Sequence, residues 1–370
     1  MPINAPPEFY EIKKKVLEAK DPYEKLKWLN ELLKVAPKHK GAHNLLIQIK
    51  KAIKKLREEL EEKERKKGTT FNPYAIKKEG DATIVILGVE NSGKSWLLNR
   101  LTNANVEESD IPFTTDLPKI GALHLNGAII QTIELPAFFE SRAYTLIRNA
   151  DLILILLDAS RDLEEQYQKI MKYLEQGGIE INKRKPNIKF ERKYSGGIKI
   201  YGEQFITDAS KEDVIKALQE FGIYNAEITI YEKVTFEDVL DAIDGSKAYK
   251  KAIFVFNKVK NEKEIEEFIK KHKINKYIII KDEKDVEKLK EKIWKELELI
   301  RVYTMDHLKK KAERPLILKK GSKVRDAVKK INEKWLDLFV YAKIKRNGKI
   351  IRVGLDYELQ DGDLLEIKIK

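Results

Sequence analysis

The 370-residue sequence predicts an α/β protein built around one phosphate-binding loop, and three observations lead to this fold class. Short runs of β-branched and aliphatic residues, typical of buried parallel strands, alternate with helical stretches between residues 83 and 300. One of these runs ends in the spacing Gly88-x4-Gly93-Lys94-Ser95, which is the pattern of a phosphate-binding loop. The first 67 residues, by contrast, show only helical periodicity.

The amino-acid composition excludes some classes of protein. The chain has no cysteine, which excludes disulfides and thiolate chemistry and suits a reducing cytoplasm. No apolar run approaches the ~20 residues that a membrane-spanning helix needs. We therefore expect a cytoplasmic protein with no membrane partner. Charged residues make up 36% of the chain, mostly Lys and Glu, which is typical of thermophilic sources.

Residues 1–67 are expected to form a helical N-terminal region. Pro7 and Pro22 stand where helices start, Asp21 supplies an N-cap, and residues 37–41 break the chain before a long third helix. The apolar residues of that third helix keep helical spacing: Leu45, Leu46, Ile49, Ile53, Leu56 and Leu60. Such a stripe packs against a core or against a protein partner, and both interpretations remain open.

The strand expected at residues 84–87 leads into the phosphate-binding loop. Its two glycines permit the tight turn in which successive backbone N–H groups converge on the phosphates of a nucleotide. Lys94 is expected to reach the β- and γ-phosphates and the Ser95 hydroxyl to ligate Mg²⁺. A helix over residues 94–102 points its positive end at the same anion. The cofactor-binding residues predicted in this stretch are Gly88, Asn91, Ser92, Gly93, Lys94, Ser95 and Trp96.

A linker begins at residue 68, and further strands follow the loop. Asn126-Gly127 between two apolar runs predicts a hairpin of antiparallel strands near 119–125 and 128–135. Alternating strands and helices with one antiparallel hairpin describe a Ras-like P-loop domain, assigned to residues 68–177 and 250–299. Its other buried strands are expected at 152–157, 252–256 and 277–280.

Several runs in the sequence resemble the Obg/Drg class of GTPases, and the Drg branch in particular. They are Gly88 to Ser95, Pro112-Phe113-Thr114-Thr115, Glu134-Leu135-Pro136, Gly178 to Phe190, Ser195-Gly-Gly-Ile and Ile300-Arg-Val-Tyr-Thr. Val353-Gly-Leu-Asp and Leu359-Gln-Asp-Gly-Asp resemble the signature of a TGS domain. The resemblance spans about residues 80–370, and the N-terminal helices resemble those of archaeal relatives. It implies an inserted α+β subdomain at 178–249 and a β-grasp TGS domain at 300–370, with Gly321-Ser322 capping a helix.

The same resemblance implies a site for GTP or GDP with Mg²⁺. The resemblance assigns the binding of the metal to Ser95, Thr115 and Glu134. It assigns the recognition of guanine to Asn257, Lys258 and Lys260. No catalytic residue is assigned.

The chain departs from the family pattern at three motifs. Glu134-Leu-Pro-Ala137 takes the place of Asp-x-x-Gly, and alanine lacks the backbone freedom of that glycine. Lys260 replaces an aspartate that accepts two hydrogen bonds from guanine, and Lys281-Asp282 replaces Ser-Ala. Asp282 is a candidate substitute for the missing carboxylate. These changes put nucleotide switching and guanine specificity in question.

Positive charge is concentrated in three parts of a chain whose net charge is +13. Residues 1–67 hold 18 Lys and Arg against 11 Asp and Glu, and residues 301–370 hold 19 against 10. Residues 182–201, which are expected to form a hairpin, hold seven Lys and Arg against one Glu, together with three aromatic residues. Basic surface with interleaved aromatics indicates the ribosome or a structured RNA as partner, with no DNA expected. A solvated lysine-rich surface is the alternative.

Three interpretations of function remain open. The first is a Drg-like GTP-binding protein, with weak GTPase activity, that acts with the ribosome in translation. The second is a degenerate GTPase that serves as a nucleotide-stabilised RNA-binding adaptor with little hydrolysis. The third is a P-loop protein of altered base preference, and equilibrium binding of GTP, GDP and ATP separates it from the other two.

Overall fold

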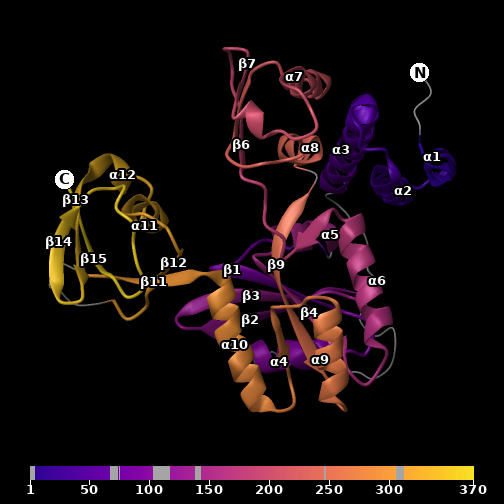
Figure 1. Cartoon of the computed structure of the whole chain (residues 1–370). Coiled ribbons are helices and arrows are strands. Elements are labelled where there is room, and N and C mark those ends of the chain that lie inside the picture. The colour runs from indigo at the N-terminus through magenta and orange to yellow at the C-terminus, as the bar shows by residue number, and fades with distance from the viewer. Residues whose placement is uncertain are drawn as a thin grey trace. The chain divides into compact units, whose positions relative to one another are not determined.

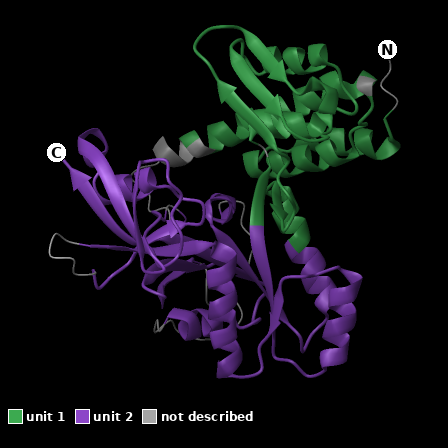
Figure 2. Cartoon of the chain, turned by 60° about the vertical axis from the view of Figure 1, so that its left-hand side comes forward, with its two compact units in different colours: residues 1–73, 171–250 green, residues 74–170, 251–370 purple. Residues whose placement is uncertain are grey.

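The computed structural model describes residues 5–66, 74, 76–102, 117–137, 143–245, 247–305 and 312–370. It divides into two compact units, coloured separately in Figure 2. The first unit comprises residues 1–73 and 171–250, and the second comprises residues 74–170 and 251–370. No described helix is long and apolar enough to cross a membrane.

The second unit contains the largest sheet of the protein (Figure 1). Its strands lie in the spatial order β10-β9-β4-β1-β3-β2 and are parallel except for β2, which is antiparallel to β3. β1 and β4 are buried along their whole length, as their unbroken apolar runs predict. The strands are β1 (Ala82–Gly88), β2 (Lys119–Leu125), β3 (Ala128–Glu134), β4 (Leu152–Asp158), β9 (Ala248–Asn257) and β10 (Tyr277–Ile279).

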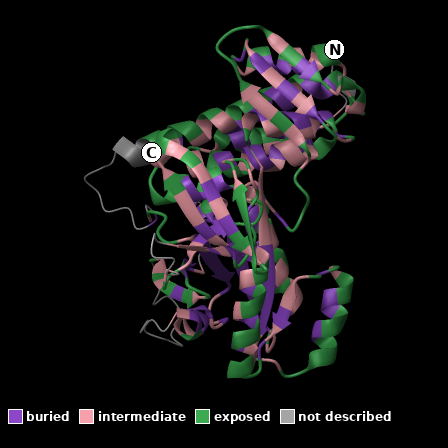
Figure 3. Ribbon diagram, turned by 90° about the vertical axis from the view of Figure 1, so that its left-hand side faces the viewer, coloured by how far each residue is buried: buried purple, intermediate pink, exposed green. Residues whose placement is uncertain are grey.

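Helices cover both faces of this sheet, and Figure 3 shows the buried residues concentrated in the strands. On one face, α4 (Lys94–Thr102) and α10 (Glu283–Leu297) pack into a cluster with Ile84, Ile86 and Leu154. On the other face, Tyr167 of α6 (Leu163–Gln176) and Phe268 of α9 (Glu262–Lys271) make aromatic contacts with the strand β9. A short helix, α5 (Tyr144–Asn149), precedes β4.

The C-terminal part of the second unit forms its own sheet, in the order β12-β11-β15-β13-β14. One helix, α11 (Val324–Ile331), packs on it through Val324, Ala327 and Val328, and a short helix, α12 (Trp335–Leu338), follows. The strands are β11 (Leu299–Thr304), β12 (Leu316–Lys319), β13 (Phe339–Arg346), β14 (Lys349–Val353) and β15 (Leu364–Ile369).

The predicted cap of α11 at Gly321-Ser322 is wrong. The N-cap residue is Lys323, whose backbone N–H donates to the Asp326 carboxylate at 2.7 Å. The Asp326 carboxylate, at the third position of the helix, therefore satisfies the backbone N–H of the N-cap residue, as in a capping box. Strand β14 was not predicted, because its residues are exposed and carry no clear alternation.

The first unit begins with three helices, α1 (Pro7–Glu18), α2 (Pro22–Val35) and α3 (His43–Lys66). As predicted, α2 starts at a proline and is capped by Asp21, which accepts from the Glu24 N–H at 2.9 Å. The apolar stripe of α3 joins one hydrophobic cluster with α7 (Lys211–Glu220) and α8 (Phe236–Asp244) of residues 171–250. Within the chain, the stripe is thus part of a core.

A three-stranded sheet completes the first unit and corrects the predicted hairpin over residues 182–201. Strands β6 (Ile188–Arg192) and β7 (Ile198–Tyr201) do not pair with each other. Strand β8 (Ala226–Ile230) lies between them, antiparallel to β6 and parallel to β7. Its alternating side chains Ala226, Ile228 and Ile230 are buried, which makes it the natural central strand. A further strand, β5 (Ile179–Ile181), pairs in parallel with the start of β9.

Candidate functional site

The phosphate-binding loop joins the end of β1 to the start of α4, and its two glycines have steric reasons to be there. A Cβ atom on Gly88 would lie 2.6 Å from the Ser92 hydroxyl oxygen and 2.8 Å from the Leu156 carbonyl oxygen. Gly93 has a φ of +95°, and a Cβ there would lie 2.5 Å from the Asn257 Nδ2 atom. The loop therefore closes tightly against two neighbouring strands, with its N–H groups at the carboxyl edge of the sheet.

Lys94 occupies the centre of this loop. Its side chain is buried, at 7% exposure, and its Nζ donates to the Val89 carbonyl at 2.9 Å. Burial lowers the pKa of Lys94 to about 8, although the nearby carboxylates of Glu134 and Glu90 act in the opposite direction. A buried ammonium that bonds only modestly to a carbonyl gains a much better partner when a phosphate enters the loop.

Ser95, Glu134 and Lys119 form a polar group beside the loop. The Ser95 hydroxyl donates to the Glu134 Oε1 atom at 2.8 Å, and the Lys119 Nζ donates to the Ser95 oxygen at 3.4 Å. Glu134 is 2% exposed, and its Oε2 atom has no hydrogen-bond partner among the described residues. Burial raises the pKa of Glu134, while the hydrogen bond from Ser95 and the positive charges of Lys119 and Lys94 act against that rise.

These residues fit a magnesium ion completed by nucleotide oxygens. Mg²⁺ prefers oxygen ligands and is commonly held by one or two protein groups plus substrate phosphates and water. The Ser95 hydroxyl and the unsatisfied Glu134 oxygen are such groups. The described residues contain no cluster of three or more His, Asp or Glu side chains that would hold a metal without a nucleotide. Thr115, the third predicted metal residue, lies outside the described residues.

Two hydrogen bonds connect the loop to the base side of the predicted site, one from the last residue of β9 and one from the residue after it. The Asn257 Nδ2 donates to the Ser92 carbonyl at 3.2 Å, and the Lys258 Nζ donates to the Asn91 carbonyl at 2.5 Å. Lys258 also pairs with the buried Asp158 carboxylate at 3.3 Å. Trp96, on α4, is partly buried against the hydrophobic cluster of the sheet, and the Arg100 guanidinium is 5.9 Å from its ring centre.

The two residues in the altered guanine motifs behave differently. Lys260 is exposed, and among the described residues no hydrogen bond or ion pair joins its side chain to the loop. Asp282 is the N-cap of α10, with its Oδ1 accepting from the Asp285 N–H at 3.1 Å. That bond engages one of the two carboxylate oxygens of the residue that the sequence offered as a substitute for the missing aspartate.

Two residues of the site were missed in the sequence, and each carried a signal. Lys119 is placed by hairpin register: the turn at Asn126-Gly127 pairs Leu125 with Ala128, and counting outward pairs Lys119 with Glu134. Asp158 is the polar residue that ends the apolar run of β4. Since parallel strands end at one edge of the sheet, it falls beside Asn257, its register partner on β9.

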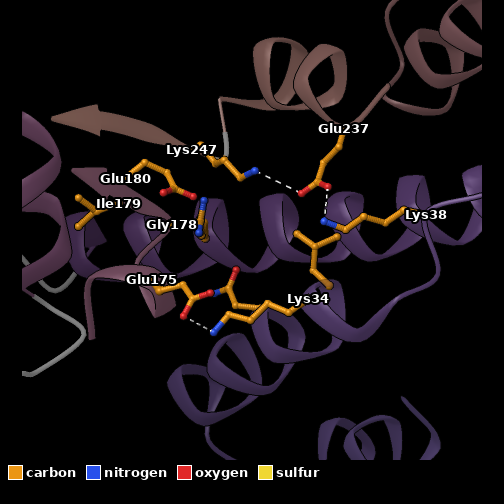
Figure 4. Close-up of a pocket in the computed structure, with 11 residues that line it drawn as sticks. Lys34, Lys38, Glu175, Gly178, Ile179, Glu180, Glu237 and Lys247 are labelled. Atoms are coloured by element: carbon orange, nitrogen blue, oxygen red, sulfur yellow. Dashed lines mark hydrogen bonds and ion pairs between the residues drawn. The ribbon is translucent and has the colours of Figure 1, made fainter. Parts of the chain in front are cut away.

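A cavity of about 270 Å³ lies in the other unit, and its charged groups pair with one another (Figure 4). Lys34 pairs with Glu175 at 2.6 Å. Glu237 pairs with Lys38 at 2.8 Å and with Lys247 at 3.2 Å. These ion pairs link α2 to the end of α6 and the segment after α2 to α8, and they give no reason to assign a ligand.

Comparison with known proteins divides most of the chain among three families. Residues 83–190 match the family described as "50S ribosome-binding GTPase", and residues 195–299 match the "C-terminal region of MMR_HSR1 domain". Residues 300–369 match the TGS domain.

Several related proteins align with almost the full length of this chain. An uncharacterized GTP-binding protein of Methanocaldococcus jannaschii is 32% identical, with 94% of this chain and 93% of the relative covered. GTP-binding protein 1 of Schizosaccharomyces pombe is 30% identical, covering 94% and 99%. The human developmentally-regulated GTP-binding protein 2 is 29% identical, covering 93% and 98%.

The chain belongs to the Drg family of GTP-binding proteins. Membership confirms the family inferred from the sequence motifs, and the P-loop and TGS matches confirm the predicted fold class. Glu134, Ala137, Lys260 and Lys281-Asp282 depart from the family pattern in this Drg-family chain, whereas the phosphate-binding loop from Gly88 to Ser95 keeps it.

Proposed function

We propose that this Drg-family chain binds GTP and GDP with Mg²⁺ in the cytoplasm and acts with the ribosome or a structured RNA in translation, with weak GTPase activity. The observation that carries the proposal is the closed phosphate-binding loop with Lys94 buried at its centre. Its geometry offers several backbone N–H groups, a helix N-terminus and one ammonium to the same anion. Relatives named as GTP-binding proteins support guanine as the base.

The expectation of weak hydrolysis rests on the segment after β3. Glu134 supplies the carboxylate that would act on the metal, through one more methylene than the family's aspartate. Ala137 follows where the family has glycine, and its Cβ restricts the backbone that would turn an N–H toward the γ-phosphate. The same observation favours the second candidate, a nucleotide-stabilised adaptor with negligible turnover.

Support for an RNA or ribosome partner comes from basic and aromatic side chains on the small sheet of the first unit. Tyr194 is fully exposed and Tyr201 half-exposed, and Lys189 and Lys199 are exposed on β6 and β7. Exposed aromatic rings next to lysines stack on unpaired bases and contact phosphates. The family described as "50S ribosome-binding GTPase" matches residues 83–190, which end at the start of this region.

Two measurements test the proposal. Equilibrium binding of GTP, GDP and ATP should show clear preference for the guanine nucleotides, and equal or better binding of ATP would contradict it. GTP turnover measured with and without ribosomes then separates the two candidates, because a GTPase should be stimulated and an adaptor should stay inactive in both.

Ribosome association is tested by co-sedimentation at low and high salt. Binding should weaken steeply as salt rises, because each phosphate contact releases a counterion. Absence of co-sedimentation at low salt would favour an ordinary solvated surface.

A further inference from the structure

Lys119 places a positive charge where the structure also puts the groups that fit Mg²⁺. It is the first residue of β2 and pairs in register with Glu134 of β3. Its Nζ lies 3.4 Å from the Ser95 hydroxyl oxygen, which is the oxygen predicted to ligate the metal. The side chain is partly buried, so it is held between the strand and the loop and does not extend into solvent.

An ammonium group, that of Lys119, already lies beside Ser95 without a metal. A second ammonium, that of Lys94, is close by, and the nearby carboxylates of Glu134 and Glu90 carry the opposite charge. A divalent cation next to Lys119 experiences like-charge repulsion, which weakens metal binding. A phosphate next to Lys119, in contrast, gains a charge-assisted hydrogen bond.

We propose that Lys119 is a built-in cation at the magnesium position, so that the chain binds guanine nucleotides almost independently of Mg²⁺. The inference rests on the proposed nucleotide binding and revises the part of Mg²⁺ in it: the metal can still bind at Ser95 and Glu134, but nucleotide affinity does not depend on it. Lys119 supplies positive charge toward the β- and γ-phosphates in place of the metal, and its hydrogen bond to the Ser95 oxygen positions the Nζ. Mg²⁺ then contributes little additional affinity.

The test is the affinity for GDP of the full-length protein in buffer with Mg²⁺ and in buffer with EDTA. For the wild type, removing Mg²⁺ should weaken GDP binding by less than about threefold. Lys119→Met keeps the length of the side chain and removes its charge. In EDTA this variant should bind GDP about 10- to 100-fold more weakly than the wild type, and Mg²⁺ should restore most of the loss.

Two further variants serve as controls for the loss of charge. Lys119→Arg keeps the charge and should keep binding in EDTA. Lys270→Met removes an exposed lysine at the C-terminal end of α9 and should behave as the wild type in both buffers. Thermal unfolding of each variant, with and without GDP in EDTA, shows whether it is folded and whether the nucleotide stabilises it.

The outcomes distinguish this inference from the proposed function. Wild-type protein that binds GDP with Mg²⁺ and loses the binding in EDTA overturns the inference alone. Equal affinities of wild type and Lys119→Met in EDTA overturn it as well. Wild-type protein that binds no GDP in either buffer overturns the proposed function together with the inference.

Discussion

At the scale of single residues, the site depends on how burial tunes a few charges. Lys94 is surrounded by the loop and has its pKa lowered to about 8, mainly through loss of hydration. A phosphate nearby favours the charged form and raises that pKa again. Nucleotide binding is therefore coupled to the uptake of a proton wherever the free protein has Lys94 neutral.

The coupling predicts the direction of a pH dependence. Below pH about 8, Lys94 is already protonated in the free protein and affinity should be flat. Above that pH the bound state holds more protons than the free state, so affinity for GDP should fall as pH rises. Calorimetry in buffers of different ionisation enthalpy should show net proton uptake only in the upper range. Affinity that rises above pH 8 would contradict this account.

A second prediction at this scale concerns Lys260, which is exposed and, among the described residues, has no hydrogen bond or ion pair to the loop. In the family's pose, Lys260→Asp restores a carboxylate that accepts hydrogen bonds from the guanine N1–H and N2–H₂ groups. GTP and GDP should then bind tighter by about 2–4 kcal/mol, while ATP should not improve, because adenine has no N1–H donor. Competition binding with the three nucleotides measures this difference. An unchanged guanine affinity would place the base elsewhere.

At the scale of elements, the strands, turns and caps with strong local signals could be predicted from the sequence. The strand β1, the helix α4 and the Asn126-Gly127 hairpin lie where their patterns placed them. The strand with which β6 and β7 pair could not be predicted. Both pair with β8, which lies between them in the sheet and comes more than 20 residues after β7 in the chain. Likewise, the Asp282 carboxylate has a local use as an N-cap that competes with a role at the base.

The candidate site was predictable in its loop and incomplete around it. The glycines, Lys94 and Ser95 follow from one local spacing. Lys119 and Asp158 are brought in by sheet register, which only a correct topology reveals. The pairing of strands therefore brings Lys119 and Asp158 to the site, and the spacing of the phosphate-binding loop could not predict either residue.

The packing of α3 on α8 supplies a prediction about stability. Lys50 of α3 is fully buried and forms an ion pair with Asp241 of α8, and Lys247 pairs with the same carboxylate at 2.9 Å. Lys50→Ala leaves a buried carboxylate with less neutralising charge. It should lower the free energy of unfolding by about 3 kcal/mol.

Lys51 provides the matched control, since it is the next residue and is half-exposed with a 3.5 Å ion pair to Glu220. Lys51→Ala should change the free energy of unfolding by less than about 0.5 kcal/mol. Urea unfolding followed by circular dichroism compares the two variants. Similar losses in both would show that the buried pair contributes no more than a surface pair.

At the scale of the whole molecule, the second unit carries both the P-loop domain and the TGS sheet, and the first unit is rich in helices. The TGS region also contributes to the core beneath the nucleotide site. Ile317 of β12 packs in the same cluster as Ile84 and Leu98, and Lys319 pairs with Asp151 at 3.0 Å. Truncation at residue 300 would therefore damage this core, and surface substitutions are the better probe of the TGS sheet.

Exposed lysines of that sheet give a prediction for the intact protein. Lys345, Lys349 and Lys368 lie on β13, β14 and β15. Changing all three to Glu should weaken ribosome co-sedimentation at low salt and reduce its salt dependence, because fewer counterions are released. GDP affinity should be unchanged, since the loop is untouched. A triple variant that sediments as the wild type does would exclude these three lysines as contacts.

The central claim is that the loop around Lys94 binds a guanine nucleotide, and calorimetric titration of GDP into wild type and Lys94→Ala tests it most directly. Lys270→Met serves as the control for loss of one positive charge in the same unit. We predict saturable binding of one GDP to the wild type and to the control, and loss of binding by about a hundredfold or more in Lys94→Ala. Equal GDP affinity in all three proteins would contradict the account.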